Sequence, residues 1–189
     1  MKRIAIFASG SGTNAQKIIE HFRDIPDAEV SLVLTNNKHA YVLERAKTLG
    51  VPAYVFDRDM FYNTDQVAEI LQRIGIDFIV LAGFLWLIPR NLLRNWPGRI
   101  VNIHPALLPK FGGKGMYGDR VHKAVIEAGE KETGISIHYV NENYDEGKII
   151  FQEKFSILPG DTPESIAERI HILEHKHYPR VIEELLGKI

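Results

Sequence analysis

Apolar runs and helix-period stretches alternate along the first half of this chain. A strand covered on both faces of a sheet reads as a continuous apolar run, and such runs occupy residues 3–8, 29–35, 53–56, 77–82 and the stretch from 99 to His104. Apolar residues three or four apart predict helices over residues 15–22, 40–49, 62–73 and 89–95. Strands that alternate with helices in this way predict a parallel sheet covered on both faces.

The pattern changes after His104. Glycines make residues 110–117 a predicted loop, and a helix is expected over 119–128. The runs 134–140 and 149–157 flank a turn and are expected to pair as a hairpin. A final helix, with a possible break, is expected from a cap at Thr162, through Pro163 and Ser165 in its first turn, to about Leu186.

These elements predict an α/β fold of one domain over residues 1–189. The expected architecture is Rossmann-like: a doubly wound, mostly parallel sheet with a C-terminal antiparallel addition and a long C-terminal helix. A single domain of this length can bury a full core.

Composition narrows the class of protein. With 45% hydrophobic residues, 25% charged residues and a net charge of −1, nothing indicates a nucleic-acid or membrane partner. The chain has no cysteine, so disulfides and thiolate chemistry are excluded, and we expect a cytoplasmic protein. The apolar run at residues 1–8 is too short for a signal peptide or a membrane span.

A glycine loop follows the first strand. Residues 10–15 fit G-x-G-x-x-A, in which main-chain N–H groups and a helix N-terminus attract an anion. Dinucleotide binding would need an acid after the second strand, but residues 35–37 are Thr, Asn and Asn, and no P-loop lysine is present. We therefore expect a phosphate at Gly12, Thr13 and Asn14, with a ligand-free tight turn as the alternative.

Asn102 and His104 are two residues apart on a strand, so their side chains share one face at its carboxyl end. Histidine exchanges a proton near neutral pH and an amide stabilises an oxyanion, so the pair suits carbonyl chemistry. The alternative is a buried structural histidine.

Residues 143–147 form an acidic turn ending in glycine, which is most often only a hairpin turn. If this turn folds over the sheet edge, Asp145 would pair with His104 and raise the pKa of the imidazole.

Residues 171–175 spell H-x-x-E-H, a zinc-protease pattern. We reject a metal site because the chain offers little room after them for a third ligand. A solvated helix face is the simpler interpretation, although Glu174 could reach a ligand.

Four motifs in order resemble the folate-dependent formyltransferases: Ser-Gly-Ser-Gly-Thr-Asn at 9–14, Leu-Ala-Gly-Phe at 81–84, Asn-Ile-His-Pro-Ala-Leu-Leu-Pro at 102–109 and Asp-Glu-Gly at 145–147. The resemblance covers essentially the whole chain. It implies formyl transfer from 10-formyltetrahydrofolate to the amine of phosphoribosylglycinamide in purine biosynthesis, without a metal. Residues 1–100 would then be the phosphate-binding half and residues 101–189 the catalytic and folate-binding half.

The resemblance also implies roles. Asn102 and protonated His104 would stabilise the oxyanion, with His104 as proton donor and Asp145 keeping it charged. Gly12, Thr13 and Asn14 would hold the phosphate and Glu174 the ribosyl group. Folate would lie against a set of residues made up of Leu85, Trp86, Leu87, Ile88 and Asn102.

Two segments depart from the family. Relatives often have a basic residue where Trp86 stands, and residues 111–119 form a longer, glycine-richer loop. Contacts from residues 58–63 are not assigned, and several residues are expected only as cavity walls: Lys110, Met116, Tyr117 and His122. The chain could be a monomer or a homodimer. The alternatives are a different acceptor amine or a non-catalytic sugar-phosphate or nucleotide-binding domain.

Overall fold

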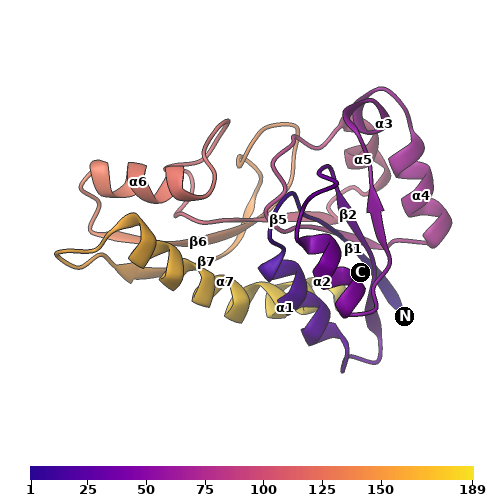
Figure 1. The fold of residues 1–189 in the computed structure, drawn as a ribbon, viewed down its shortest axis with the longest axis horizontal. Helices are drawn as coiled ribbons and strands as arrows, with labels where there is room; N and C mark the ends of the chain where they lie inside the picture. The colour runs from indigo at the N-terminus through magenta and orange to yellow at the C-terminus, as the bar shows by residue number, and fades with distance from the viewer.

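A single seven-stranded sheet organises the computed structural model, which describes residues 1–189 (Figure 1). The strands lie in the order β3-β2-β1-β4-β5-β6-β7. Neighbours from β3 through β5 are parallel, whereas β6 and β7 are antiparallel additions. The strand bounds are β1 Lys2–Phe7, β2 Ala28–Thr35, β3 Ala53–Val55, β4 Phe78–Leu81, β5 Ile100–His104, β6 Glu132–Tyr139 and β7 Ile149–Ser156. The predicted fold class is confirmed.

Helices cover both faces of the sheet. One core contains α1 (Thr13–Phe22), α2 (Val42–Thr48) and α7 (Pro163–Leu186), and the other contains α4 (Gln66–Ile74), α5 (Arg90–Asn95) and the short α3 (Arg58–Tyr62). The remaining helix, α6 (Asp119–Glu127), packs beside α7 (Figure 1).

The strand period explains the two cores. In β1, Ile4 and Ile6 belong to the α1/α7 core, while Ala5 and Phe7 belong to the α4/α5 core. All four are fully buried. Successive side chains of a strand point to opposite faces of the sheet, and here both faces are covered.

Two helix predictions were wrong. The helix expected over 62–73 is two helices, because Asp57 caps α3 by accepting the Met60 N–H at 2.9 Å and a second helix begins only at Gln66. The possible break in α7 is absent, although Pro179 lies inside it. Packing holds this helix to the sheet, since the buried Tyr178 hydroxyl donates to the Leu81 carbonyl at 2.9 Å. Its start is as predicted, with a Thr162–Ser165 capping box.

The sheet reverses its winding between β1 and β4. From β1 the chain proceeds to β2 and β3 on one side, then returns to β4 and β5 on the other. Ligands of doubly wound sheets bind at the carboxyl ends of strands at such a reversal, so the fold points to this edge as the site. No helix combines the length and apolar character needed to cross a membrane.

Candidate active site

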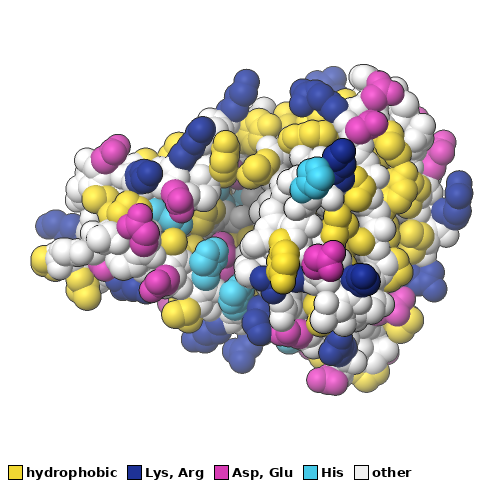
Figure 2. Space-filling model, in the orientation of Figure 1, with side chains coloured by type: hydrophobic (Ala, Val, Ile, Leu, Met, Phe, Trp, Pro, Cys, Tyr) yellow, Lys and Arg dark blue, Asp and Glu magenta, His cyan; other side chains and the backbone are white.

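A cavity of about 410 Å³ opens at this sheet edge. Its wall is formed by the glycine loop, the segment after β4, the end of β5, the loop before α6 and one side of α7. Figure 2 shows this face of the molecule hollowed near its middle, with histidine and acidic side chains beside the hollow. The size is that of a small-molecule site.

The glycine loop presents free main-chain donors to the cavity. No N–H from Ser11 to Asn14 donates to a backbone carbonyl, and these groups lie at the start of α1. Gly12 has φ 75° and touches Val42 so closely that a Cβ would lie 2.4 Å from that side chain. Glycine is therefore required there, and the free donors line a part of the cavity that suits an anion.

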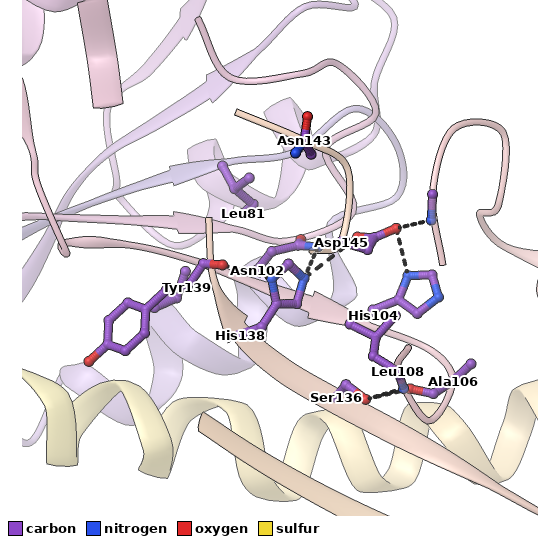
Figure 3. A network of polar contacts seen from close by, with 12 residues as sticks. Leu81, Asn102, His104, Ala106, Leu108, Ser136, His138, Tyr139, Asn143 and Asp145 are labelled. Carbon is purple, nitrogen blue, oxygen red and sulfur yellow. Dashed lines mark hydrogen bonds and ion pairs between the residues drawn. The ribbon is translucent and has the colours of Figure 1, made fainter. Parts of the chain in front are cut away.

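Strand β5 delivers Asn102 and His104 to the same cavity, as the sequence predicts. The turn that follows is fixed by the buried Ser136 hydroxyl, which donates to the Ala106 carbonyl at 2.7 Å and accepts the Leu108 N–H at 2.9 Å (Figure 3). Asp145 lies over this edge, with its Oδ2 3.5 Å from His104 Nδ1. The pairing expected from the acidic turn is present.

Asp145 raises the pKa of His104 as expected, but the net shift of this pKa is in the opposite direction. Burial lowers the pKa of this imidazole, and the raising effects of the Asp145 carboxylate and the Phe111 carbonyl do not offset it. Only 3% of His104 is exposed, so the desolvation of an imidazolium outweighs one carboxylate at 3.5 Å. Since Nε2 donates to the Phe111 carbonyl at 2.7 Å, the neutral ring carries its proton there and Nδ1 faces Asp145.

Two groups that hold Asp145 were not predicted. Its Oδ2 accepts the Gly113 N–H at 3.0 Å, and its Oδ1 lies 3.5 Å from His138 Nε2. Burial raises the pKa of the Asp145 carboxyl, but the His138 hydrogen bond, the electrostatic effect of the nearby His104 and the Gly113 N–H outweigh burial, so this pKa is lowered overall. Asp145 is therefore the anionic partner in this site.

His138 was detectable in principle from the alternation of β6. It pairs directly with Asn102 across the β5–β6 ladder, and the Asn102 amide lies 3.1 Å from its Nε2. His138 Nδ1 donates to the Tyr139 carbonyl at 2.9 Å, so the ring is held with Nε2 directed at Asn102 and Asp145 (Figure 3). This contact orients Asn102 beside His104 and Asp145.

Glu174 joins α7 to the glycine loop. Its buried carboxylate accepts from Asn14 Nδ2 at 2.9 Å and lies 3.1 Å from His171 Nδ1. The hydrogen bond to Glu174 raises the pKa of His171. His175 lies outside the cavity lining, and no group of three or more His, Asp or Glu side chains is arranged to hold a metal ion.

The segment expected to meet folate spans two cavities. Leu85 lines the large one, while Trp86, Leu87 and Ile88 line a smaller one of about 50 Å³ that Asn102 and Asp145 also border. Among the expected wall residues, Met116, Tyr117 and His122 line the large cavity, whereas Lys110 pairs with Glu130 at 2.7 Å.

Arg58 supplies a cation beside Trp86. Its guanidinium lies 5.6 Å from the Trp86 ring and 5.0 Å from the Tyr62 ring. The Tyr62 hydroxyl donates to the Leu87 carbonyl at 2.9 Å, which ties α3 to the segment after β4. This contact was not predicted, because α3 itself was not predicted.

Comparisons with known proteins identify the family of the chain. A family model described as formyl transferase matches residues 2–182. Similar proteins include phosphoribosylglycinamide formyltransferases from Arabidopsis thaliana, chloroplastic, with 44% identity over 96% of this chain and 64% of the plant protein, and from Bacillus subtilis strain 168, with 41% identity over 99% and 96%. The chain thus spans just under two thirds of the plant relative. The crystal structure of glycinamide ribonucleotide transformylase 1 from Geobacillus kaustophilus superposes with a TM-score of 0.89 and 42% identity, covering 99% of this chain and 100% of the other.

Proposed function

The chain belongs to the formyl transferase family, and we propose that it transfers a formyl group from 10-formyltetrahydrofolate to the amine of phosphoribosylglycinamide. The observation that carries the proposal is the Asn102, His104 and Asp145 cluster in one cavity with a main-chain anion site. An amide donor, a titratable imidazole and a fixed carboxylate suit acyl transfer. The anion site would bind the phosphate of a phosphorylated acceptor.

We place the phosphoribosyl group along the glycine loop. The N–H groups of Gly12, Thr13 and Asn14 meet the phosphate, and Glu174 accepts from a ribose hydroxyl. Glu174 is already held by Asn14, so the two subsites are aligned with each other. We place folate against the segment from Leu85 to Ile88, which lines the two cavities, with Asn102 between the two substrates.

The reaction begins when the acceptor amine attacks the formyl carbon. The carbonyl becomes an oxyanion, to which the Asn102 amide donates a hydrogen bond. The proton lost by the amine is relayed to His104 Nδ1, where the Asp145 carboxylate stabilises the imidazolium. Nε2 then donates its proton to N10 in place of the Phe111 carbonyl, the bond from carbon to N10 breaks, and tetrahydrofolate leaves.

Both parts of the chain contribute to this site. We assign the phosphate subsite to residues 1–100 and the catalytic groups to residues 101–189. The proposed folate subsite includes residues from both parts, because Leu85 to Ile88 lie in the first part and Asn102 lies in the second.

The proposal is tested by a formyl-transfer assay with purified protein. We expect 10-formyltetrahydrofolate to be consumed with phosphoribosylglycinamide as acceptor, and not with ribosylglycinamide at the same concentration, because the anion site would be empty. Transfer only to a different amine would favour another acceptor within the family. Binding of the phosphoribosyl compound without any transfer would indicate a non-catalytic sugar-phosphate-binding domain.

Arg58 gives a prediction for the folate subsite. Its guanidinium is exposed on two aromatic rings and forms no ion pair, so it is available to the carboxylates of a folate glutamyl tail. We expect Arg58→Ala to raise the KM for 10-formyltetrahydrofolate about three- to tenfold, the effect of about 1 kcal/mol, with kcat unchanged. Arg94→Ala, an exposed arginine on α5, is the matched control. Equal KM values for both variants would contradict this role.

A further inference from the structure

We propose that Arg45 is a positioning residue that holds the glycine loop in its phosphate-binding shape. The inference rests on the proposed function of that loop as the phosphate subsite. Arg45 lies on α2, outside the cavity lining, and acts through the main chain of Ser11 rather than by touching a ligand.

Helix α2 accounts for the direction of two loop peptides. The Gly10 carbonyl accepts from the Val42 N–H at 3.1 Å, and the Ser11 carbonyl accepts from Arg45 Nε at 2.8 Å. In a trans peptide the N–H points opposite to the carbonyl. Because both carbonyls are turned toward α2, the following N–H groups of Ser11 and Gly12 are turned away from it.

Those two N–H groups have no backbone acceptor. Val42 holds the Gly10 carbonyl with its main-chain N–H, and its side chain packs against Gly12. These two contacts fix α2 against the loop. The Ser11 carbonyl, by contrast, depends on a single side chain. If Arg45 is lost, the Ser11–Gly12 peptide is free to rotate, and one donor of the anion site loses its direction.

Arg45 is itself held in place. Its Nη1 donates to Gln16 Oε1 on α1, and its guanidinium lies 5.0 Å from the Tyr41 ring. It forms no ion pair with a carboxylate, so its positive charge adds to the potential at the start of α1. The planar guanidinium can donate to a carbonyl and to a side-chain amide while it stacks on a ring. The ammonium group of lysine cannot reproduce this arrangement.

The test compares Arg45→Met and Arg45→Lys with wild-type enzyme. We expect Arg45→Met to raise the KM for phosphoribosylglycinamide at least about tenfold, the effect of losing a charge-assisted hydrogen bond, with kcat within about twofold. Arg45→Lys keeps the charge without the fork and should fall between. The KM for 10-formyltetrahydrofolate should not change, since that subsite lies beyond the loop.

A phosphate-free acceptor separates this role from a general structural one. With ribosylglycinamide at high concentration, wild type and Arg45→Met should have the same kcat/KM, because no phosphate meets the loop. Arg23→Met is the matched control: Arg23 also donates to a backbone carbonyl, that of Leu49 at 3.3 Å, but away from the loop. Equal losses with both acceptors, or a loss confined to kcat, would overturn the proposal.

The affinity for phosphoribosylglycinamide can be measured by calorimetry without turnover. This measurement therefore reports the effect of Arg45 on binding separately from any effect on catalysis. We expect weaker binding by Arg45→Met and unchanged binding by Arg23→Met. Wild-type protein that binds this ligand without transferring formyl would overturn the proposed function alone, and the Arg45 comparison would still be decisive. Unchanged binding in Arg45→Met would overturn the positioning role alone.

Discussion

His104→Ala is expected to lower kcat by about 10²- to 10⁴-fold, the usual worth of a positioned acid–base group. His104 is the group that carries the proton between the amine and N10, and no other side chain can take over: His138 lies on the far side of Asp145, with its Nδ1 committed to the Tyr139 carbonyl. Calorimetric affinities for both substrates should change by less than about threefold, because the phosphate and folate contacts lie elsewhere.

His21→Ala is the matched control for a histidine outside the cavity. His21 pairs with Glu183 at 2.7 Å on the α1/α7 surface, and loss of this exposed pair should cost little stability and no activity. Steady-state kinetics and calorimetry on both variants check the prediction. A His104→Ala enzyme with wild-type kcat would remove the imidazole from the mechanism.

Features encoded locally were predictable. The same-face placement of Asn102 and His104 follows from the strand period, and the glycine loop from its position between a strand and a helix. The lack of an acidic residue after β2 can likewise be seen in the sequence alone. In the structure this position holds Asn36, which accepts from the Ser9 hydroxyl at 2.7 Å. Such features need only the neighbouring residues to form.

Features that depend on packing between distant segments were not predictable. Arg45 donates to a backbone carbonyl of another segment, whereas Phe111 and Gly113 meet distant side chains with their own backbone groups. A sequence pattern does not show which carbonyl or N–H a loop will present. The pKa of His104 is a further case. Its carboxylate neighbour was foreseen from the turn at Asp145, but the sign of the shift depends on burial, which only the packed structure fixes.

Asp145→Asn is expected to lower kcat by about a hundredfold or more and to lower the pKa of His104 further. The carboxylate raises the pKa of His104 against the effect of burial, so its removal leaves burial less opposed. Asparagine keeps an oxygen for the Gly113 N–H, which alanine would leave without a partner, so the loop before α6 should stay in place. The lost charge should therefore act chiefly on the imidazolium that forms during turnover.

The sign of the pH dependence follows from the same shift. Neutral His104 is the form that receives the proton, and it is lost as pH falls through a pKa that lies below the ordinary value of 6.5. The acid limb of kcat/KM that belongs to His104 should move to lower pH in Asp145→Asn, and the imidazole signals in an NMR titration of the ligand-free protein, assigned by their loss in His104→Ala, should move with it. The NMR titration is independent of the ionisation of the substrate amine, which is the same for both enzymes. A His104 pKa that rises in Asp145→Asn, or a wild-type rate that falls as pH climbs past 6.5, would mean that the reaction starts from the imidazolium instead.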